Sequence, residues 1–297
     1  MKTDKAFQQA VECMPPLLRM QLEGMEEQTE IEELRLRAGR PPGVKAALEE
    51  RVLDLEPLSA ETLRDILSRA ARFSVHSYAE SLRYGYITLA GGHRLGVCGT
   101  AVVENGEVSG IRNISSLNLR VARQIRDAGE GLELVSDGRL HSTLLISPPG
   151  LGKTTLLREL IRRTSDAGWT VGVADERCEI AALSEGVPQF DVGRCTDVIE
   201  GCSKQQAALM LLKTMSPALI ALDEITSPGD VQAVGLCAHC GVSVVASAHA
   251  KDLEDLRRRA LYRELLALHL FERVIIVSLD GEKRTYQVED IKEESEC

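Results

Sequence analysis

The sequence predicts an α/β fold in which a small α+β domain precedes a domain built on a parallel-rich sheet. From about residue 139 onward, apolar strand-like runs alternate with amphipathic helical segments. The runs 218–222 and 242–246 are apolar almost throughout, which is typical of strands buried on both faces of a parallel sheet. Before about residue 128, the strand-like segments instead alternate polar and apolar residues and are joined by tight turns.

The N-terminal domain is expected at residues 1–128, with an antiparallel sheet. Helices are predicted at 4–14, 17–25 and 59–71. Pro15 and Pro16 separate the first two, and Ser59 is a suitable N-cap for the third. Strands are predicted at 33–37 and in a hairpin of 86–89 with 94–103, and Asn105-Gly106 marks a further turn.

A linker is expected at residues 129–138, where the chain is polar and carries glycines, and the second domain at 139–297. The charged tail from residue 289 reads as a solvated end. The predicted elements of the second domain are strands at 143–147, 170–174, 218–222, 242–246 and 273–278 and helices near 153–166, 203–215, 228–238, 252–257 and 259–268.

Composition narrows the possible functions. A length of 297 residues suits two domains, and a net charge of −10 argues against a whole-chain preference for nucleic acid or anionic lipid. No apolar run approaches a membrane span, and the N-terminus lacks a signal-peptide core. We therefore expect a cytoplasmic protein that contacts membranes only through partners.

The cysteines fit the same compartment, because a cytoplasmic protein keeps its thiols reduced. Of the eight, Cys237 and Cys240 have C-x-x-C spacing, which raises the alternative of a zinc or redox site. No second pair of this spacing follows, so buried thiols are the favoured interpretation.

A phosphate-binding loop is predicted between the first strand and the first helix of the second domain. Glycines let backbone N–H groups close around phosphate oxygens, and the following helix directs its N-terminal donors to the same point. Lys153 is expected to reach the β- and γ-phosphates, and the Thr154 hydroxyl to ligate Mg²⁺. The alternative is an ordinary strand-to-helix turn. The loop residues are Ser147, Pro148, Pro149, Gly150, Leu151, Gly152, Lys153, Thr154 and Thr155.

One position departs from the usual loop pattern, because Ser147 stands where a glycine is expected. That glycine eases the turn of the strand into the loop. We expect Pro148 and Pro149 to preset this turn, since proline fixes φ.

Two acidic residues follow the buried run 218–222 directly. Open α/β sheets bind ligands at the carboxyl ends of their strands, so Asp223 is expected to hold Mg²⁺ through a bound water. Glu224 would then polarise the attacking water. The alternative is a strand-end pair that simply meets solvent.

Two further strand ends carry polar residues. If the strand at 170–174 adjoins the phosphate-loop strand, Asp175 and Glu176 face the nucleotide. Glu176 is then an alternative to Glu224 as the general base. The alternative is a surface loop in which one acid pairs with Arg177. His249 follows the run 242–246 at the end of the stretch 244–249, and it is either a γ-phosphate sensor or a structural histidine.

Arginines that could complete a nucleotide site lie ahead of the linker, at Arg112, Arg120 and Arg123, and in the second domain at Arg194. An arginine finger can act within one chain or from a neighbouring subunit. The alternative for each is a solvated surface side chain.

Together these motifs resemble the secretion ATPase superfamily of type II and type IV secretion and type IV pili. Its members carry a Walker A loop, an acidic Asp box, Walker B and a His box, which match 147–155, 175–177, 219–224 and 247–249 here. Segments 84–89, 91–94, 113–120 and 190–194 further resemble the stage III sporulation protein AA family, and this likeness spans nearly the whole chain. Two departures are Ser147 and the absence of the tetracysteine insertion of many type II ATPases.

The resemblance implies a RecA-like P-loop domain that binds ATP and Mg²⁺. It implies an ATPase in the mother-cell cytoplasm that powers or assembles a secretion-like channel to the forespore, with integral membrane proteins as partners. It also implies a homo-oligomer, expected as a hexamer. In that oligomer, Arg112, Arg120 and Arg123 would complete the nucleotide sites.

Two other functions fit parts of the pattern. A RecA-like nucleic-acid translocase also uses Asp-Glu-Arg runs, but the negative charge and scarce aromatics oppose strand binding, so no nucleic acid is expected. A nucleotide-dependent scaffold with negligible turnover is the third possibility.

Overall fold

The protein divides into two compact units in a computed structural model that describes residues 4–46, 49–71, 85–281 and 283–291. One unit comprises residues 1–123 together with 183–189, and the other comprises 124–182 with 190–297. The division differs from the expected one, since residues 129–138 lie inside the second unit. Segment 183–189 returns to the first unit, where its Gln189 side chain accepts a hydrogen bond from the Gly91 N–H at 2.6 Å.

The first unit is an α+β structure with a six-stranded sheet in the order β3-β2-β1-β6-β5-β4, in which every neighbouring pair is antiparallel. The predicted hairpin is β4 with β5, and the Asn105-Gly106 turn joins β5 to β6 with both residues at positive φ. The strands are β1 (Ile31–Arg37), β2 (Gly43–Ala46), β3 (Glu49–Val52), β4 (Tyr86–Thr88), β5 (Arg94–Glu104) and β6 (Glu107–Arg120).

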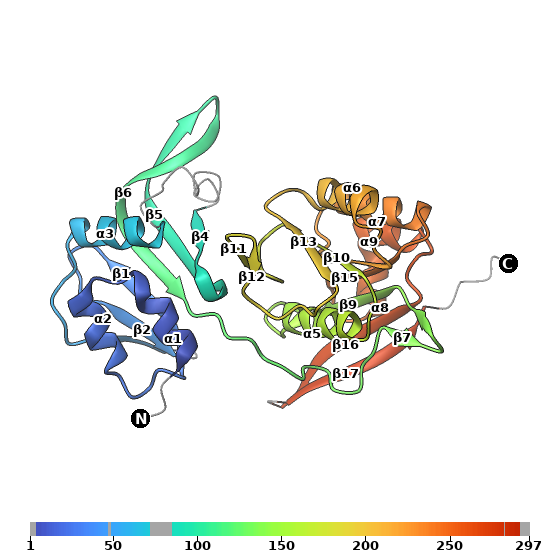
Figure 1. Ribbon diagram of the computed structural model, residues 1–297, viewed down its shortest axis with the longest axis horizontal. Helices are drawn as coiled ribbons and strands as arrows, with labels where there is room; N and C mark the ends of the chain where they lie inside the picture. The colour runs from blue at the N-terminus through green and yellow to red at the C-terminus, as the bar shows by residue number, and fades with distance from the viewer. Residues whose placement is uncertain (1–3, 47–48, 72–84, 282, 292–297) are drawn as a thin grey trace. The chain divides into compact units, whose positions relative to one another are not determined.

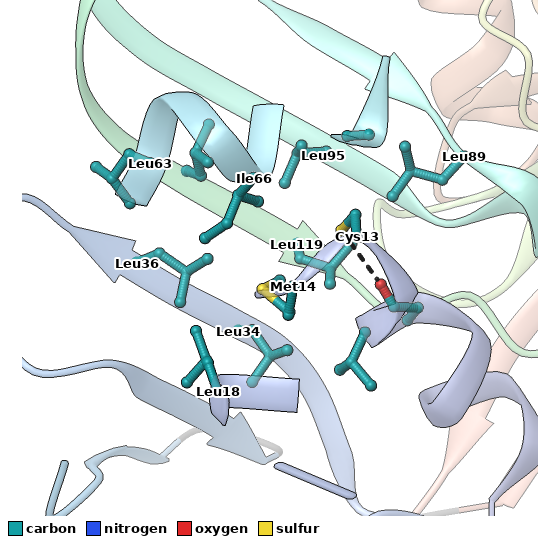
Figure 2. Packing of buried hydrophobic residues seen from close by; sticks show 14 of the residues in the cluster. Cys13, Met14, Leu18, Leu34, Leu36, Leu63, Ile66, Leu89, Leu95 and Leu119 are labelled. Carbon is teal, nitrogen blue, oxygen red and sulfur yellow. Dashed lines mark hydrogen bonds between the residues drawn. The ribbon is translucent and has the colours of Figure 1, made fainter. Parts of the chain in front are cut away.

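Helices cover one face of this sheet (Figure 1). They are α1 (Lys5–Ala10) with the 3-10 turn Val11–Cys13, α2 (Pro16–Glu23) and α3 (Ala60–Ala70). Ser59 caps α3 as predicted, accepting a hydrogen bond from the Thr62 N–H. Leu34, Leu36 and Leu119 from the sheet pack with Ile66 and Leu18 from the helices in one buried cluster, shown in Figure 2.

The second unit is built on a seven-stranded sheet in the order β13-β10-β14-β15-β9-β16-β17. Every pairing in it is parallel except β16 with β17, a C-terminal hairpin that the sequence had not indicated. The strands are β9 (Thr143–Ser147), β10 (Val171–Asp175), β13 (Thr196–Glu200), β14 (Leu219–Glu224), β15 (Ser243–His249), β16 (Arg273–Asp280) and β17 (Lys283–Asp290). The expected solvated tail therefore begins inside β17, and its residues 292–297 lie outside the described part of the chain.

Helices lie on both faces of this sheet because its strands are apolar on both sides. Leu144 and Ile146 of β9 share a buried cluster with residues of α6, α7 and α9, which lie near one another in Figure 1. The alternate residue Leu145 is also buried but belongs outside that cluster, as do the apolar residues of α5, so α5 packs on the opposite face. The helices are α5 (Lys153–Asp166), α6 (Lys204–Thr214), α7 (Pro228–His239), α8 (Leu253–Arg258) and α9 (Ala260–Leu266).

No helix in the described residues is long and apolar enough to cross a bilayer. Two short antiparallel pairs complete the fold. Strands β7 (Val135–Ser136) and β8 (Arg139–Leu140) belong to the second unit, and β11 (Leu183–Ser184) and β12 (Val187–Pro188) to the first.

A buried histidine makes the first unit sensitive to acid. The His93 side chain is fully buried, and its Nδ1 accepts a hydrogen bond from the Ala122 N–H at 3.0 Å. Burial, reinforced by the Arg123 guanidinium, lowers the pKa of His93 from 6.5 to about 4. The folded unit therefore holds this imidazole neutral at pH values where the unfolded chain is protonated.

We predict that the first unit loses up to about 3 kcal/mol of stability between pH 6.5 and pH 4 through His93 alone. The contribution is fully present above pH 6.5, because neither state then binds the proton. Amide hydrogen exchange in β1 and β5, corrected for intrinsic rates, measures it. His93→Gln should flatten the pH dependence, whereas the exposed His239→Gln should not; an equal slope in wild type and His93→Gln would contradict the prediction.

Candidate functional site

The predicted site residues converge at the carboxyl edge of the parallel strands in the second unit. Strands β10, β14, β15 and β9 are consecutive neighbours there and end at Asp175, Glu224, His249 and Ser147. Ser147 pairs with His249 in the register of β9 and β15. Parallel strands place their carboxyl ends on one side of a sheet, so segments distant in sequence meet at this edge.

The loop after β9 has the backbone of a phosphate-binding turn. Gly150 and Gly152 have φ values of 82° and 90°, which side chains other than hydrogen rarely tolerate. Gly152 is the N-cap of the 14-residue helix α5, and no side chain caps its first turn. That turn begins at Lys153 and continues through Thr154 and Thr155, and its free N–H groups therefore point toward the loop and favour an anion.

Ser147 fits the loop without the glycine expected there. Its φ is not positive, and its side chain is fully buried. The Ser147 hydroxyl donates to the Pro148 carbonyl at 2.7 Å and lies 3.3 Å from the Lys153 Nζ, which can donate to it. The strain in this loop thus falls on Gly150 and Gly152, and a small polar residue is accommodated at the start.

A chain of polar contacts joins the loop lysine to the predicted general base. The Lys153 Nζ lies 2.6 Å from Nδ1 of His249, and Nε2 of His249 lies 3.0 Å from a carboxylate oxygen of Glu224. Because the ammonium donates, Nδ1 accepts, and the Nε2–H group donates a hydrogen bond to the Glu224 carboxylate. An Arg177 nitrogen lies 3.7 Å from the other Glu224 oxygen, so Arg177 pairs with Glu224. Burial lowers the pKa of Lys153 to about 8, against the opposing effect of Glu224.

A second cluster surrounds Lys204, the first residue of α6. Lys204 had not been identified as a site residue from the sequence. Its Nζ lies 2.5 Å from Glu176, 2.8 Å from Asp223 and 3.5 Å from Asp230. Burial alone would lower the pKa of Lys204, but the surrounding carboxylates outweigh burial and raise it. Burial raises the pKa of Asp223 to about 6, against the opposing effect of Lys204.

The carboxylate of Asp223 fits the predicted role of holding a divalent cation. Its side chain is 8% exposed, and its Oδ1 accepts a hydrogen bond from the Lys204 ammonium at 2.8 Å. Its Oδ2 accepts no hydrogen bond from the described residues. A register irregularity between Leu222 and Glu224 shifts the strand here, so consecutive acids both reach the carboxyl edge. Buried carboxylate oxygens of this kind, together with the Thr154 hydroxyl, are the hard ligands that Mg²⁺ takes.

Asp175 and Glu176 are adjacent in sequence but contact different groups. Strand β10 lies beside β13 and β14, with β14 and β15 between it and β9, so the condition on which both acids were expected to face the nucleotide is not met. The fully buried Asp175 accepts the N–H groups of Glu179, Ile180 and Ala181 at 2.8–2.9 Å and organises the following turn. Glu176 instead points to Lys204.

The prediction that an arginine completes the nucleotide site remains a prediction. Arg112 and Arg120 lie on β6 of the first unit, and Arg120 is 3.8 Å from Glu33. Arg123 has structural partners in that unit, donating to the Asp4 carboxylate and to the carbonyls of residues 28 and 31. Arg194 lies in the second unit and donates to the Asp166 carbonyl.

Two other arginines near the site were not anticipated. The Arg284 Nε on β17 donates to the Leu151 carbonyl at 2.9 Å and so braces the outside of the phosphate loop. Arg158 of α5 is 7% exposed and donates to the Ile180 and Glu179 carbonyls at 2.7 and 2.6 Å, with its guanidinium 4.0 Å from the Phe190 ring centre. Helical periodicity places Arg158 beside Thr154, Arg162 and Ser165, away from the leucines of α5, so no signal in the sequence indicated that this arginine is buried.

Comparisons with known proteins identify the family of this chain. The sequence profile of the family described as "Sporulation stage III, protein AA" matches residues 7–296. The chain is 37% identical over 275 residues to stage III sporulation protein AA of Bacillus subtilis, covering 90% of this chain and 89% of that protein.

The fold is similar to two solved ATPases. The pilus retraction motor PilT with bound ADP has a TM-score of 0.63 at 16% identity, covering 89% of this chain and 80% of that one. The Legionella pneumophila ATPase DotB has a TM-score of 0.57 at 17% identity, covering 93% and 80%. At these identities the likeness establishes the RecA-like fold of secretion ATPases.

We predict that Arg158→Met lowers the free energy of unfolding of the second unit by about 3 kcal/mol, because two buried carbonyls lose a charged donor. Urea denaturation followed by fluorescence of Trp169, the single tryptophan, reports on this unit. Arg258→Met is the matched control, since its pair with Glu254 is solvent-exposed. Equal midpoints for the two variants would show that Arg158 does not hold the turn.

Proposed function

This chain belongs to the sporulation stage III protein AA family, and from that membership we propose that it is an ATP-hydrolysing motor or assembly ATPase. It would serve a secretion-like channel complex between mother cell and forespore during endospore formation. The observation that carries the hydrolysis is the contact of Lys153 with His249 and of His249 with Glu224 at the mouth of the phosphate loop. Phosphate binding and water activation are thereby linked at one strand edge.

The loop residues supply the binding step. The N–H groups of the loop and of the first turn of α5 cradle the phosphates, and Lys153 turns from His249 toward the β- and γ-phosphate oxygens. An anionic partner restores the ordinary pKa of the Lys153 ammonium. Thr154 and Asp223 would hold Mg²⁺, which neutralises charge on the phosphate oxygens.

Glu224 is proposed to orient and polarise the attacking water. When Lys153 leaves, Nδ1 of His249 loses its donor and keeps only the Ser147 carbonyl oxygen nearby, at 3.3 Å, while Nε2 still donates to Glu224. His249 can therefore transmit the presence of the γ-phosphate to Glu224. Glu176 is the weaker candidate for general base, because its carboxylate is paired with the Lys204 ammonium at 2.5 Å.

The cellular setting is proposed from the family. We place the protein in the mother-cell cytoplasm, bound to integral membrane proteins of the sporulation channel. It would work as a homo-oligomer, proposed as a hexamer, in which Arg112 or Arg120 completes a nucleotide site. Arg123 is the least suited of the three, because its guanidinium already binds Asp4 and two carbonyls.

Lys153→Ala is expected to weaken ATP binding at least about tenfold, because it removes the ammonium proposed to contact the β- and γ-phosphates. Fluorescence titration with a labelled ATP analogue measures the affinity. Lys213→Ala, at an exposed lysine of α6, is the control and should bind as wild type. Unchanged affinity and full turnover in Lys153→Ala would overturn the site assignment.

Glu224→Gln is expected to retain ATP binding and to lose about 10²–10³-fold in turnover, since the amide cannot accept a proton from water. Phosphate release and sporulation of cells carrying the variant are measured together, with the exposed Glu254→Gln as control. Normal turnover would transfer the role to Glu176, tested by Glu176→Gln. Lost turnover with normal sporulation would favour a nucleotide-dependent scaffold over a motor.

A further inference from the structure

Lys204 is buried among acids at the proposed cation site. Its side chain is 1% exposed although it opens a helix whose other end faces solvent. It contacts the ends of β10 and β14 and the first turn of α7, through Glu176, Asp223 and Asp230. Burying a lysine costs several kcal/mol unless its charge is compensated, so this placement serves the acids around it.

The three acids depend on Lys204 to different degrees. Asp230 is satisfied without it, because its other oxygen accepts the N–H groups of Thr226 and Ser227 at 2.7 and 2.9 Å. Glu176 is 40% exposed and can be solvated by water. Asp223 is buried, Lys204 is the donor to its Oδ1, and its Oδ2 accepts no hydrogen bond from the described residues, while nearby Asp175 and Glu176 add negative charge.

Lys204 is therefore the group that compensates the charge of Asp223. The ammonium lies 2.8 Å from one oxygen of this carboxylate. It neutralises negative charge that would otherwise attract a divalent cation, and it fills space beside that oxygen. With Lys204, the three acids around it keep two uncompensated negative charges; without it they would keep three. A hydrated Mg²⁺ ion is attracted much more strongly in the second case.

We propose that Lys204 is a positioning residue that stands in for the divalent cation at Asp223 and keeps the free ion out, so that the metal enters only together with the nucleotide. This inference rests on the proposed ATPase site. The phosphates of the nucleotide bring the additional negative charge that lets a metal ion bind beside Lys204. Lys204 holds Asp223 and Glu176 in position until then, and makes metal binding conditional on ATP.

Mn²⁺ binding to the nucleotide-free protein, followed by electron paramagnetic resonance, tests the proposal. Wild type should bind Mn²⁺ weakly alone and strongly once ATP is added. Lys204→Met should bind Mn²⁺ alone about tenfold or more tightly than wild type, and the double variant Lys204→Met/Asp223→Asn should lose that gain. Lys204→Arg, which keeps the charge, should behave as wild type, and Lys213→Met is the surface control.

Three results would overturn the proposal. The first is tight Mn²⁺ binding by the nucleotide-free wild type that is lost in Asp223→Asn. The second is that Lys204→Met binds Mn²⁺ no more tightly than wild type, and the third is that the double variant binds it as tightly as Lys204→Met. The first result is measured on proteins that retain Lys204, so it tests the proposal even if Lys204→Met does not fold. A protein that binds no ATP would refute the proposed function, whereas the nucleotide-free measurements would still report on Lys204.

Discussion

The burial of the parallel sheet on both faces is the constraint on which the rest of the second unit depends. A strand covered by helices on both sides has no place for a charge along its length, as the residues of β9 and the apolar part of β14 show. Charged groups can enter only where the strands end. Consequently Lys153, Glu224, His249 and Asp223 meet at one edge, and the site follows from how the sheet buries its core.

Burial at this edge also explains why the charged residues there occur in compensated groups. Lys153 is matched through His249 with Glu224, and Lys204 with Asp223 and Glu176. Removing one partner of a buried charge pair costs about 3–5 kcal/mol, a large part of the roughly 5–15 kcal/mol of net stability usual for a protein. The network therefore stabilises the fold as well as placing groups for chemistry.

The sequence revealed the parts of this arrangement that are local. Continuous apolar runs identified β9, β10, β14, β15 and β16, and the glycines at 150 and 152 identified the loop. It could not reveal strand order, so the distance of β10 from β9 was missed. A lysine one residue after a serine N-cap looks like a solvated helix start, and only the tertiary fold shows Lys204 to be buried.

Lys153 and Lys204 are expected to respond differently when a phosphate group binds. Lys153 borders a loop whose free N–H groups attract an anion, and its pKa of about 8 makes its ammonium costly to keep without one. Lys204 is fixed by carboxylates on three elements, and its pKa is raised, so its charge persists. An arriving nucleotide would therefore draw Lys153 away from His249 while Lys204 stays in place. Under the proposed function, the movable lysine would report phosphate to Glu224, and the fixed lysine would keep in position the acids proposed to receive the metal.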